Sequence, residues 1–175
     1  LLQTYGIAPS RVVIELTEQS PTDDFYLLDT ALHHYRDMGF SIALDDLGAG
    51  YSSLRLWSEL RPDYVKIDRH FIDGIHRDAV KREFVGSILQ MAKASRSKVI
   101  AEGIELEEEL AVLCEMGVDL LQGYLLCRPQ ETPPTDARKM LPAIGQPSTP
   151  LGEEGSDLTA LLNEQLAVSI ATPTA

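Results

Sequence analysis

One pattern repeats from Tyr5 to about Pro129: a short run of β-branched and other apolar residues, a turn, and a segment with helical spacing. Strands that alternate with helices in this way predict βαβ units around a parallel sheet. The apolar residues of each strand follow one another rather than alternate, which is typical of strands covered on both faces. The fold class is therefore α/β, with strands predicted at 11–16, 41–44, 63–68, 98–101 and 118–121.

The segments between these strands predict helices. The first is expected to begin at Ser20-Pro21 and to end at Gly39, with one face formed by Phe25, Leu28, Leu32 and Tyr35. The loop 48–54 opens a second helix, in which Trp57 is expected to pack in the core. A third helix, from about Asp78 to Ala94, is expected to pack through Val80, Phe84, Ile88 and Met91.

The last helix of the repeat is predicted from Glu107 to Met116, before Gly117. Its first residues, Glu107, Glu108 and Glu109, indicate a solvated helix start, because the helix dipole favours negative charge there.

Every predicted strand ends in polar residues that can bind a metal or a phosphate. They are Glu15, the pair Asp45-Asp46, Lys66 with Asp68, Glu102, and Gln122. A single aspartate at a strand end would mean little, because aspartate is common in turns and helix caps. In parallel α/β folds, however, functional residues gather at the carboxyl edge of the sheet, and here consecutive strands all supply one. The pattern favours a functional site.

The residue types narrow the chemistry of that site. Carboxylate and amide oxygens suit Mg²⁺ or Mn²⁺ better than zinc. Adjacent Asp45 and Asp46 can share two ions, and such pairs catalyse in-line phosphoryl displacement. Lys66 among carboxylates would stay charged. The residues indicate metal-assisted phosphodiester hydrolysis, although enolase-type and aldol-type barrels also combine carboxylates, a lysine and Mg²⁺ at strand ends.

Composition excludes some classes of function. The formal net charge is −12, from 27 acidic and 15 basic residues. So acidic a chain is a poor candidate for binding DNA or RNA, whose phosphates require lysine and arginine. Cys114 and Cys127 lack metal-ligand spacing and indicate two buried, reduced thiols. The sequence shows no membrane-span or signal-peptide pattern, which predicts a cytoplasmic domain, with a membrane anchor elsewhere in a longer parent left open.

The end of the sequence differs from the repeat. Residues 142–155 are rich in Pro, Gly, Ser and Thr and predict a linker. Residues 156–175 predict a short helix and a tail, with Ser156 as the helix cap. The predicted organisation is thus a domain over 1–141, a linker over 142–155 and a terminal segment over 156–175.

Taken in order and spacing, the polar blocks resemble those of EAL domains, bacterial enzymes that linearise cyclic di-GMP to pGpG with Mg²⁺ or Mn²⁺. The resemblance covers about the first three quarters of the chain. It rests on Glu15-Leu16-Thr17-Glu18, on Ala43 to Leu54 with its Asp45-Asp46 pair, on Val65-Lys66-Ile67-Asp68, on Ile100 to Glu105, and on Gln122-Gly123-Tyr124. It implies a TIM-barrel-like (β/α)₈ fold, of which about five βα units are visible here.

The resemblance also implies roles for these residues. Glu15, Asp45 and Asp46 match metal ligands of a two-metal site, and Lys66, Glu102 and Gln122 match catalytic residues. Glu18, Asp68 and Glu105 match supporting residues, Glu18 as the one that steadies the loop after the aspartate pair. The family further implies cyclic di-GMP as ligand, a homodimer formed through that loop, and other domains in a longer signalling protein.

The chain departs from the family pattern at three places. Leu47 and Ala49 stand where the family usually has Phe and Thr. The Glu-Ala-Leu strand and the following Asn strand, which precede the Glu15 block in the family, do not occur in this sequence. Since a full barrel takes about 250 residues, we expect an incomplete first metal site and no activity from this chain alone. The alternatives are a sensor that binds cyclic di-GMP without cleaving it, and a truncated inactive product.

Overall fold

The structure is a computed structural model that describes residues 2–17, 25–48 and 53–130. Its strands are β1 (Val13–Leu16), β2 (Ser41–Leu47), β3 (Tyr64–Ile67), β4 (Lys98–Ala101) and β5 (Leu120–Leu121). Its α-helices are α1 (Phe25–Asp37), α2 (Ser53–Leu60), α3 (Arg69–Ile72), α4 (Ala79–Ser95) and α5 (Glu107–Glu115), preceded by short 3₁₀ turns at Gln3–Tyr5 and Pro9–Arg11. All these elements belong to the compact unit Leu1–Arg128. The predicted start of the first helix, the linker and the tail helix lie outside the described residues.

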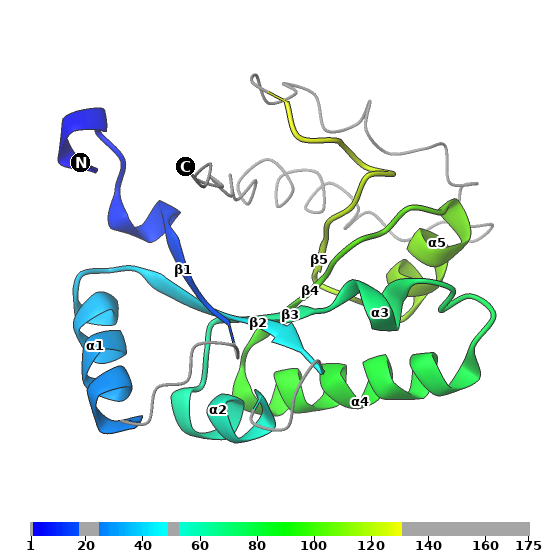
Figure 1. The fold of residues 1–175 in the computed structure, drawn as a ribbon, viewed down its shortest axis with the longest axis horizontal. Coiled ribbons are helices and arrows are strands. Elements are labelled where there is room, and N and C mark those ends of the chain that lie inside the picture. The colour runs from blue at the N-terminus through cyan, green and yellow to red at the C-terminus, as the bar shows by residue number, and fades with distance from the viewer. Residues whose placement is uncertain (1, 18–24, 49–52, 131–175) are drawn as a thin grey trace, which may run out of the picture. The chain divides into compact units, whose positions relative to one another are not determined.

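The strands form one parallel sheet in the order β1-β2-β3-β4-β5, so each strand pairs with the next one along the chain (Figure 1). A doubly wound sheet would reverse direction at a switch point, whereas a (β/α)₈ barrel adds its strands in sequence. Figure 1 shows α1, α2 and α4 on the same side of the sheet. The prediction of a parallel α/β fold is confirmed.

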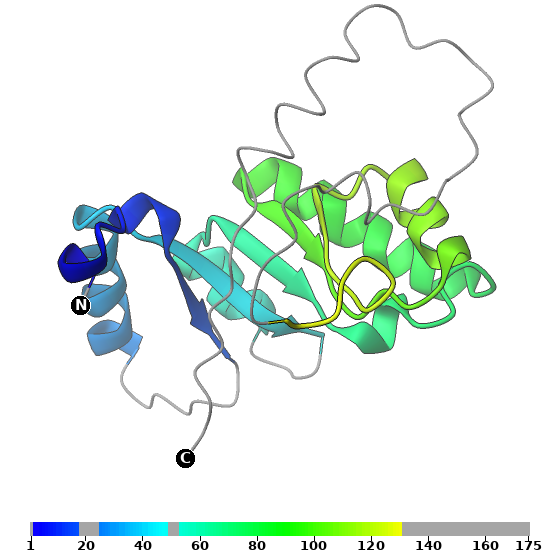
Figure 2. The same cartoon turned by 90° about the horizontal axis from the view of Figure 1, so that it is seen from above.

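The core lies between the sheet and the helices that pack against it. Figure 2 shows the same elements seen from above. The larger cluster joins β2, β3 and β4 to α4 and α5, and its fully buried members include Leu44, Val65, Ile67, Val85, Val99 and Leu113. A smaller cluster forms around Leu32, Ile42 and Leu60 and holds α1 and α2 against β2. Successive residues of β2 and β3 are buried, which confirms strands covered on both faces.

Helix α4 packs only in part through the predicted residues: Ile88 is buried and Phe84 packs partly buried against the core, as expected. Its buried residues are Val85, Ile88 and Ala92, whereas Val80 and Met91 are 76% and 40% exposed. The prediction followed the largest apolar side chains. The small Ala92 is buried instead.

The two cysteines are less buried than predicted. Cys114 is exposed and Cys127 is partly buried, so the prediction of two buried thiols is wrong.

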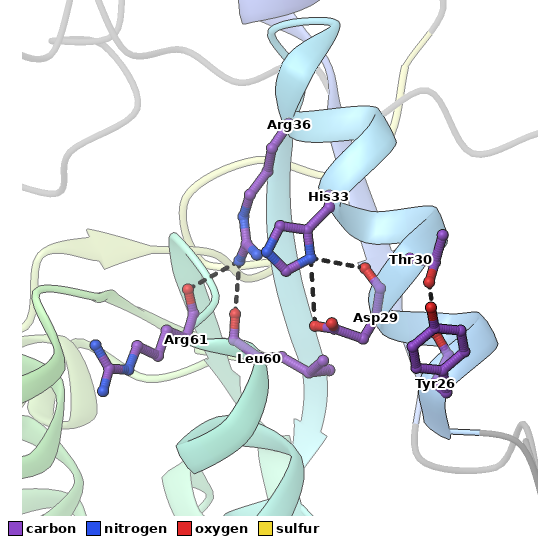
Figure 3. A network of polar contacts seen from close by, with 7 residues as sticks. All are labelled: Tyr26, Asp29, Thr30, His33, Arg36, Leu60 and Arg61. Carbon is purple, nitrogen blue, oxygen red and sulfur yellow. Dashed lines mark hydrogen bonds and ion pairs between the residues drawn. The ribbon is translucent and has the colours of Figure 1, made fainter.

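Polar contacts tie neighbouring helices together at their ends. The Arg36 guanidinium of α1 donates hydrogen bonds to the carbonyl oxygens of Leu60 (2.7 Å), the last residue of α2, and of Arg61 (2.9 Å), which follows it (Figure 3). These bonds satisfy carbonyl groups that a helix end leaves unpaired. The Trp57 indole N–H of α2 points to Ser95 Oγ (3.1 Å) and Ser97 Oγ (3.3 Å) at the end of α4, and its ring is buried, which confirms the expected core role.

Two aspartates connect the strands at the amino edge of the sheet. The Asp63 carboxylate, just before β3, accepts a hydrogen bond from the Ile42 N–H of β2 at 2.8 Å. Asp119, just before β5, accepts from the Val99 N–H of β4, also at 2.8 Å. Ile42 and Val99 are fully buried, so these side chains pair backbone groups at strand starts.

Replacing either aspartate by alanine should therefore destabilise the chain. We expect Asp63→Ala and Asp119→Ala each to lower the free energy of unfolding by roughly 1–3 kcal/mol, because a buried N–H loses its charged acceptor. Asp63→Asn keeps an acceptor oxygen and should cost less. Urea unfolding measures the effect, with Asp37→Ala, at an exposed position of α1, as the control. Equal midpoints for Asp37→Ala and Asp63→Ala would contradict this role.

Candidate active site

The centre of the site is the side chain of Lys66 on β3. Its ammonium lies 2.9 Å from Asp45 Oδ1, 2.9 Å from Glu102 Oε1 and 3.2 Å from Glu15 Oε2. The Lys66 side chain is only 9% exposed. Residues from β1, β2 and β3, and the residue that follows β4, thus meet at one point of the carboxyl edge.

The strand register explains why these side chains meet. Glu15 pairs with Ala43, Ala43 pairs with Tyr64, and Lys66 pairs with Ile100. Asp45, Lys66 and Glu102 each lie two residues beyond Ala43, Tyr64 and Ile100. Because side chains two residues apart share a face, all four charged groups project from the same face of the sheet.

Strand β2 is irregular at the aspartate pair. Between Leu44 and Leu47 the register with β3 shifts, so that one extra residue stands on β2. Asp46 there has a φ of +56°, a left-handed conformation that non-glycine residues rarely adopt. The Asp46 N–H donates to Asp45 Oδ1 at 3.0 Å. A bulge of this kind interrupts the regular alternation of side chains and is common next to functional sites.

The electrostatics of the cluster favour an additional cation. Burial by itself would lower the pKa of Lys66, but hydrogen bonds and negative charge from Glu102 and Asp45 outweigh it and hold that pKa above its usual range. Burial raises the pKa of Glu102; Lys66 opposes this shift, and the charges of Asp45 and Glu15 add to it. Three carboxylates face one ammonium, so the cluster keeps an excess of negative charge.

The donor chemistry of this cluster fits a hard divalent cation, since its oxygens are carboxylate oxygens. Among residues 2–17, 25–48 and 53–130, no three His, Cys, Asp or Glu side chains are arranged so as to hold a metal ion by themselves. The three cluster carboxylates are instead directed at the Lys66 ammonium.

The other predicted site residues lie around the cluster. Asp68 caps α3 by accepting from the His70 N–H at 2.8 Å, and Glu105 pairs with Arg69 at 2.9 Å. Gln122 is exposed at the end of β5; its N–H donates to Ala101 O and its carbonyl accepts from Ile104 N–H. These backbone bonds hold β5 beside the segment that follows Glu102. Glu18 lies outside the described residues.

Glu109 contradicts the prediction of a solvated helix start. It is 1% exposed, whereas Glu107 and Glu108 are exposed as predicted. Sequence reasoning missed it because three consecutive glutamates look alike. The available signal was position, since a glutamate in the third place of a helix often turns back to pair backbone N–H groups.

A further feature that sequence reasoning missed lies after the aspartate pair. Gly48 has a φ of +105°, and a Cβ on it would clash with the ring of Phe71. Phe71 in turn stacks on Phe84 of α4, with ring centroids 4.0 Å apart. The chain that leaves the aspartates therefore rests on an aromatic ring of α3.

Comparison of the sequence with known proteins points to one protein family. The sequence model of the EAL domain matches residues 1–129. The probable cyclic di-GMP phosphodiesterase PdeA of Escherichia coli is 35% identical over 130 residues, which are 74% of this chain and 18% of PdeA. The cyclic di-GMP phosphodiesterase NbdA of Pseudomonas aeruginosa is 37% identical over 128 residues, 73% of this chain and 16% of NbdA. The chain thus spans less than a fifth of the length of these relatives.

Comparison with solved structures points to the same family. A standalone EAL protein from Vibrio cholerae, solved with cyclic di-GMP bound, superposes with a TM-score of 0.70 at 31% identity, over 73% of this chain and 54% of that protein. BlrP1 of Klebsiella pneumoniae, solved as a manganese and cyclic di-GMP complex, gives 0.69 at 36% identity, over 73% of this chain and 33% of BlrP1. The EAL-type, TIM-barrel-like fold expected from the sequence is confirmed over this part.

The contact between Gly48 and Phe71 predicts a sharp difference between two glycine substitutions. Gly48→Ala combines a strained φ with a steric clash. Gly117 also has a strained φ, +74°, but nothing lies within 4 Å of the carbon that Gly117→Ala adds, so that variant shows the strain without the clash. Backbone strain alone costs on the order of 1–3 kcal/mol. We therefore expect Gly48→Ala to lower the melting temperature clearly more than Gly117→Ala. Similar losses in both variants would show that Phe71 moves aside without cost.

Proposed function

The chain belongs to the EAL domain family, and on that premise we propose that it carries the carboxyl-edge catalytic residues of a metal-dependent phosphodiesterase that hydrolyses cyclic di-GMP to linear pGpG. The observation that supports this most directly is the cluster in which Lys66 lies within 3.2 Å of carboxylates from Glu15, Asp45 and Glu102. Such a group combines a fixed positive charge with oxygen donors for a cation, as cleavage of a phosphodiester requires.

Divalent cations, Mg²⁺ or Mn²⁺, would be held by Glu15, Asp45 and Asp46, and would supply a nucleophilic water and neutralise charge on the phosphate. The excess of carboxylates over ammonium in the cluster supports this assignment. The bulge at Asp45-Asp46 breaks the regular alternation of β2 at two adjacent carboxylates, and two adjacent carboxylates can serve a pair of ions.

The remaining residues act on substrate and water. Lys66 keeps its proton, because its carboxylate partners hold its pKa high, and it provides a fixed positive charge beside the phosphate. Glu102, whose pKa is raised by burial, accepts a proton from the attacking water. Gln122 is exposed at the end of β5, and we assign it to orienting water and substrate.

We infer a cytoplasmic enzyme module that works within a larger signalling protein and dimerises through the loop after Asp46. Relatives much longer than this chain support the inference of a larger protein. Within the described residues, no helix has both the length and the apolar character needed to cross a bilayer.

Hydrolysis of cyclic di-GMP with Mg²⁺ tests the function. Two proteins are compared: the 175-residue chain, and a completed domain in which the part of the Vibrio cholerae EAL protein that precedes its matching region is joined to the N-terminus. We expect pGpG from the completed domain and none from the chain alone. Tight binding without pGpG in the completed domain would instead indicate a cyclic di-GMP sensor.

The Asp45-Asp46 pair yields a second prediction. In the completed domain, Asp46→Asn should abolish turnover and leave the fold intact, because an amide neither carries the charge nor binds a cation as a carboxylate does. Turnover and circular dichroism measure both effects. Retained turnover would exclude Asp46 as a ligand of a second ion.

The proposed role of Lys66 gives a third prediction. Lys66→Met in the completed domain should lower kcat by about 10²–10³-fold, the usual effect of removing one preorganised group that stabilises the transition state. Lys93→Met, at an exposed position of α4, is the matched control for loss of a lysine charge. A loss in kcat of the same size in both variants would argue against a specific role for Lys66.

A further inference from the structure

Glu109 is a buried charged residue that the proposed chemistry does not use. It lies in the first turn of α5 and is 1% exposed. One carboxylate oxygen accepts from the Gly74 N–H at 2.8 Å, and the other accepts from the Glu105 and Leu106 N–H groups, both at 3.2 Å. Bonding to Leu106 is ordinary helix capping, but Gly74 is 35 residues away, in the loop between α3 and α4. The side chain therefore joins two loops as well as capping a helix.

One of these loops begins with Glu102. The backbone of the segment 102–106 is held from three directions: Glu102 N–H donates to Ile67 O of β3 (3.2 Å), Ile104 N–H donates to Gln122 O beside β5 (3.1 Å), and the N–H groups of Glu105 and Leu106 donate to Glu109. Glu109 supplies the anchor at the far end of the segment from Glu102. Without it, the backbone N–H groups at that end would lose their acceptor, and the exposed ion pair of Glu105 with Arg69 would be the remaining tie there.

The other loop follows from Lys66 through α3. At the start of α3, Arg69 lies against Gly103, where an added Cβ would be 2.5 Å from its Cγ, and its guanidinium pairs with Glu105 at 2.9 Å. At the far end of α3, Gly74 is bound by Glu109. The chain after Lys66 and the chain after Glu102 are thus tied together twice, by an exposed ion pair and by a buried carboxylate. The buried tie is the stronger, since water does not compete for it.

We propose that Glu109 is a positioning residue: by binding the loops that follow β3 and β4, it sets the Glu102 carboxylate against the Lys66 ammonium. It touches neither reacting group, and it acts through the backbone of 102–106 and through α3. This role rests on the proposed function for its kinetic consequence, but the positioning itself can be measured without turnover.

The variants that test the role are Glu109→Ala, which removes both acceptor oxygens, and Glu109→Gln, which keeps one and is the milder change. Glu108→Ala is the matched control, because its carboxylate is exposed one residue away on the same helix. Two readouts are needed: NMR of the isotope-labelled 175-residue chain, observing the Gly74, Glu105 and Leu106 amides and the Lys66 Nζ signal, and kcat and KM of the completed domain.

We expect the three amides and the Lys66 Nζ signal to shift in Glu109→Gln, and further in Glu109→Ala if it folds, with no change in Glu108→Ala. In the completed domain, kcat should fall about 10–100-fold, as for other residues that orient a ligating or reacting group, with KM nearly unchanged. A folded Glu109→Gln whose amides shift while Lys66 Nζ does not would overturn the proposal and leave Glu109 as a fold-stabilising residue. If the Lys66 signal of the 175-residue chain depends on Glu109 while the completed domain shows no turnover, the positioning role is upheld and the phosphodiesterase function is refuted.

Discussion

The Lys66 ammonium has to be partnered at its nearly buried position, and much of the sheet is arranged around that requirement. An unpaired charge there would cost several kcal/mol, so the strands can associate only in a register that brings carboxylates to it. Glu15, Asp45 and Glu102 come from β1, β2 and the end of β4, and all reach β3. A slip of one residue in any of these strands would turn its charged side chain to the other face. The site and the register of the sheet therefore depend on each other.

The two edges of the sheet are stabilised in different ways. At the amino edge, Asp63 and Asp119 pair backbone N–H groups of the neighbouring strands, and no reacting group is near. At the carboxyl edge the corresponding ties run between loops, through Glu109 to Gly74 and through Arg69 to Glu105. This division agrees with the general behaviour of barrel folds, in which one edge serves stability and the other serves chemistry. It also explains why acidic side chains in this chain have two unrelated uses.

Charge imbalance links the local site to the whole chain. With a net charge of −12, the protein cannot attract a phosphate ester by its overall field. The cluster around Lys66 is itself negative, since three carboxylates surround one ammonium. The proposed binding of an anionic dinucleotide therefore calls for cations at this edge, and the same carboxylates that make the edge negative are the groups able to hold them.

Much of the fold and of the site could be predicted from the residues. The repeated strand and helix pattern predicted the parallel sheet, and polar residues at successive strand ends predicted that Glu15, Asp45, Lys66 and Glu102 would meet. These predictions succeed because strand ends and side-chain alternation are local properties of the chain. The buried face of α4 was predicted only in part, with Ile88 and Phe84 right and Val80 and Met91 wrong, because several faces of that helix carry apolar residues and only the sheet selects among them.

The sequence by itself determined the order of the strands, the residue types at their carboxyl ends and hence the kind of chemistry they support. Only the tertiary structure decided how those residues are held: the bulge in β2 at Asp45-Asp46, the Phe71 ring beside Gly48, and the burial of Glu109 next to exposed glutamates. The physical reason is that each of these depends on contacts between segments distant in sequence. Burial and hydrogen-bond partners arise from packing, and a carboxylate in the sequence looks the same whether it faces water or three backbone N–H groups.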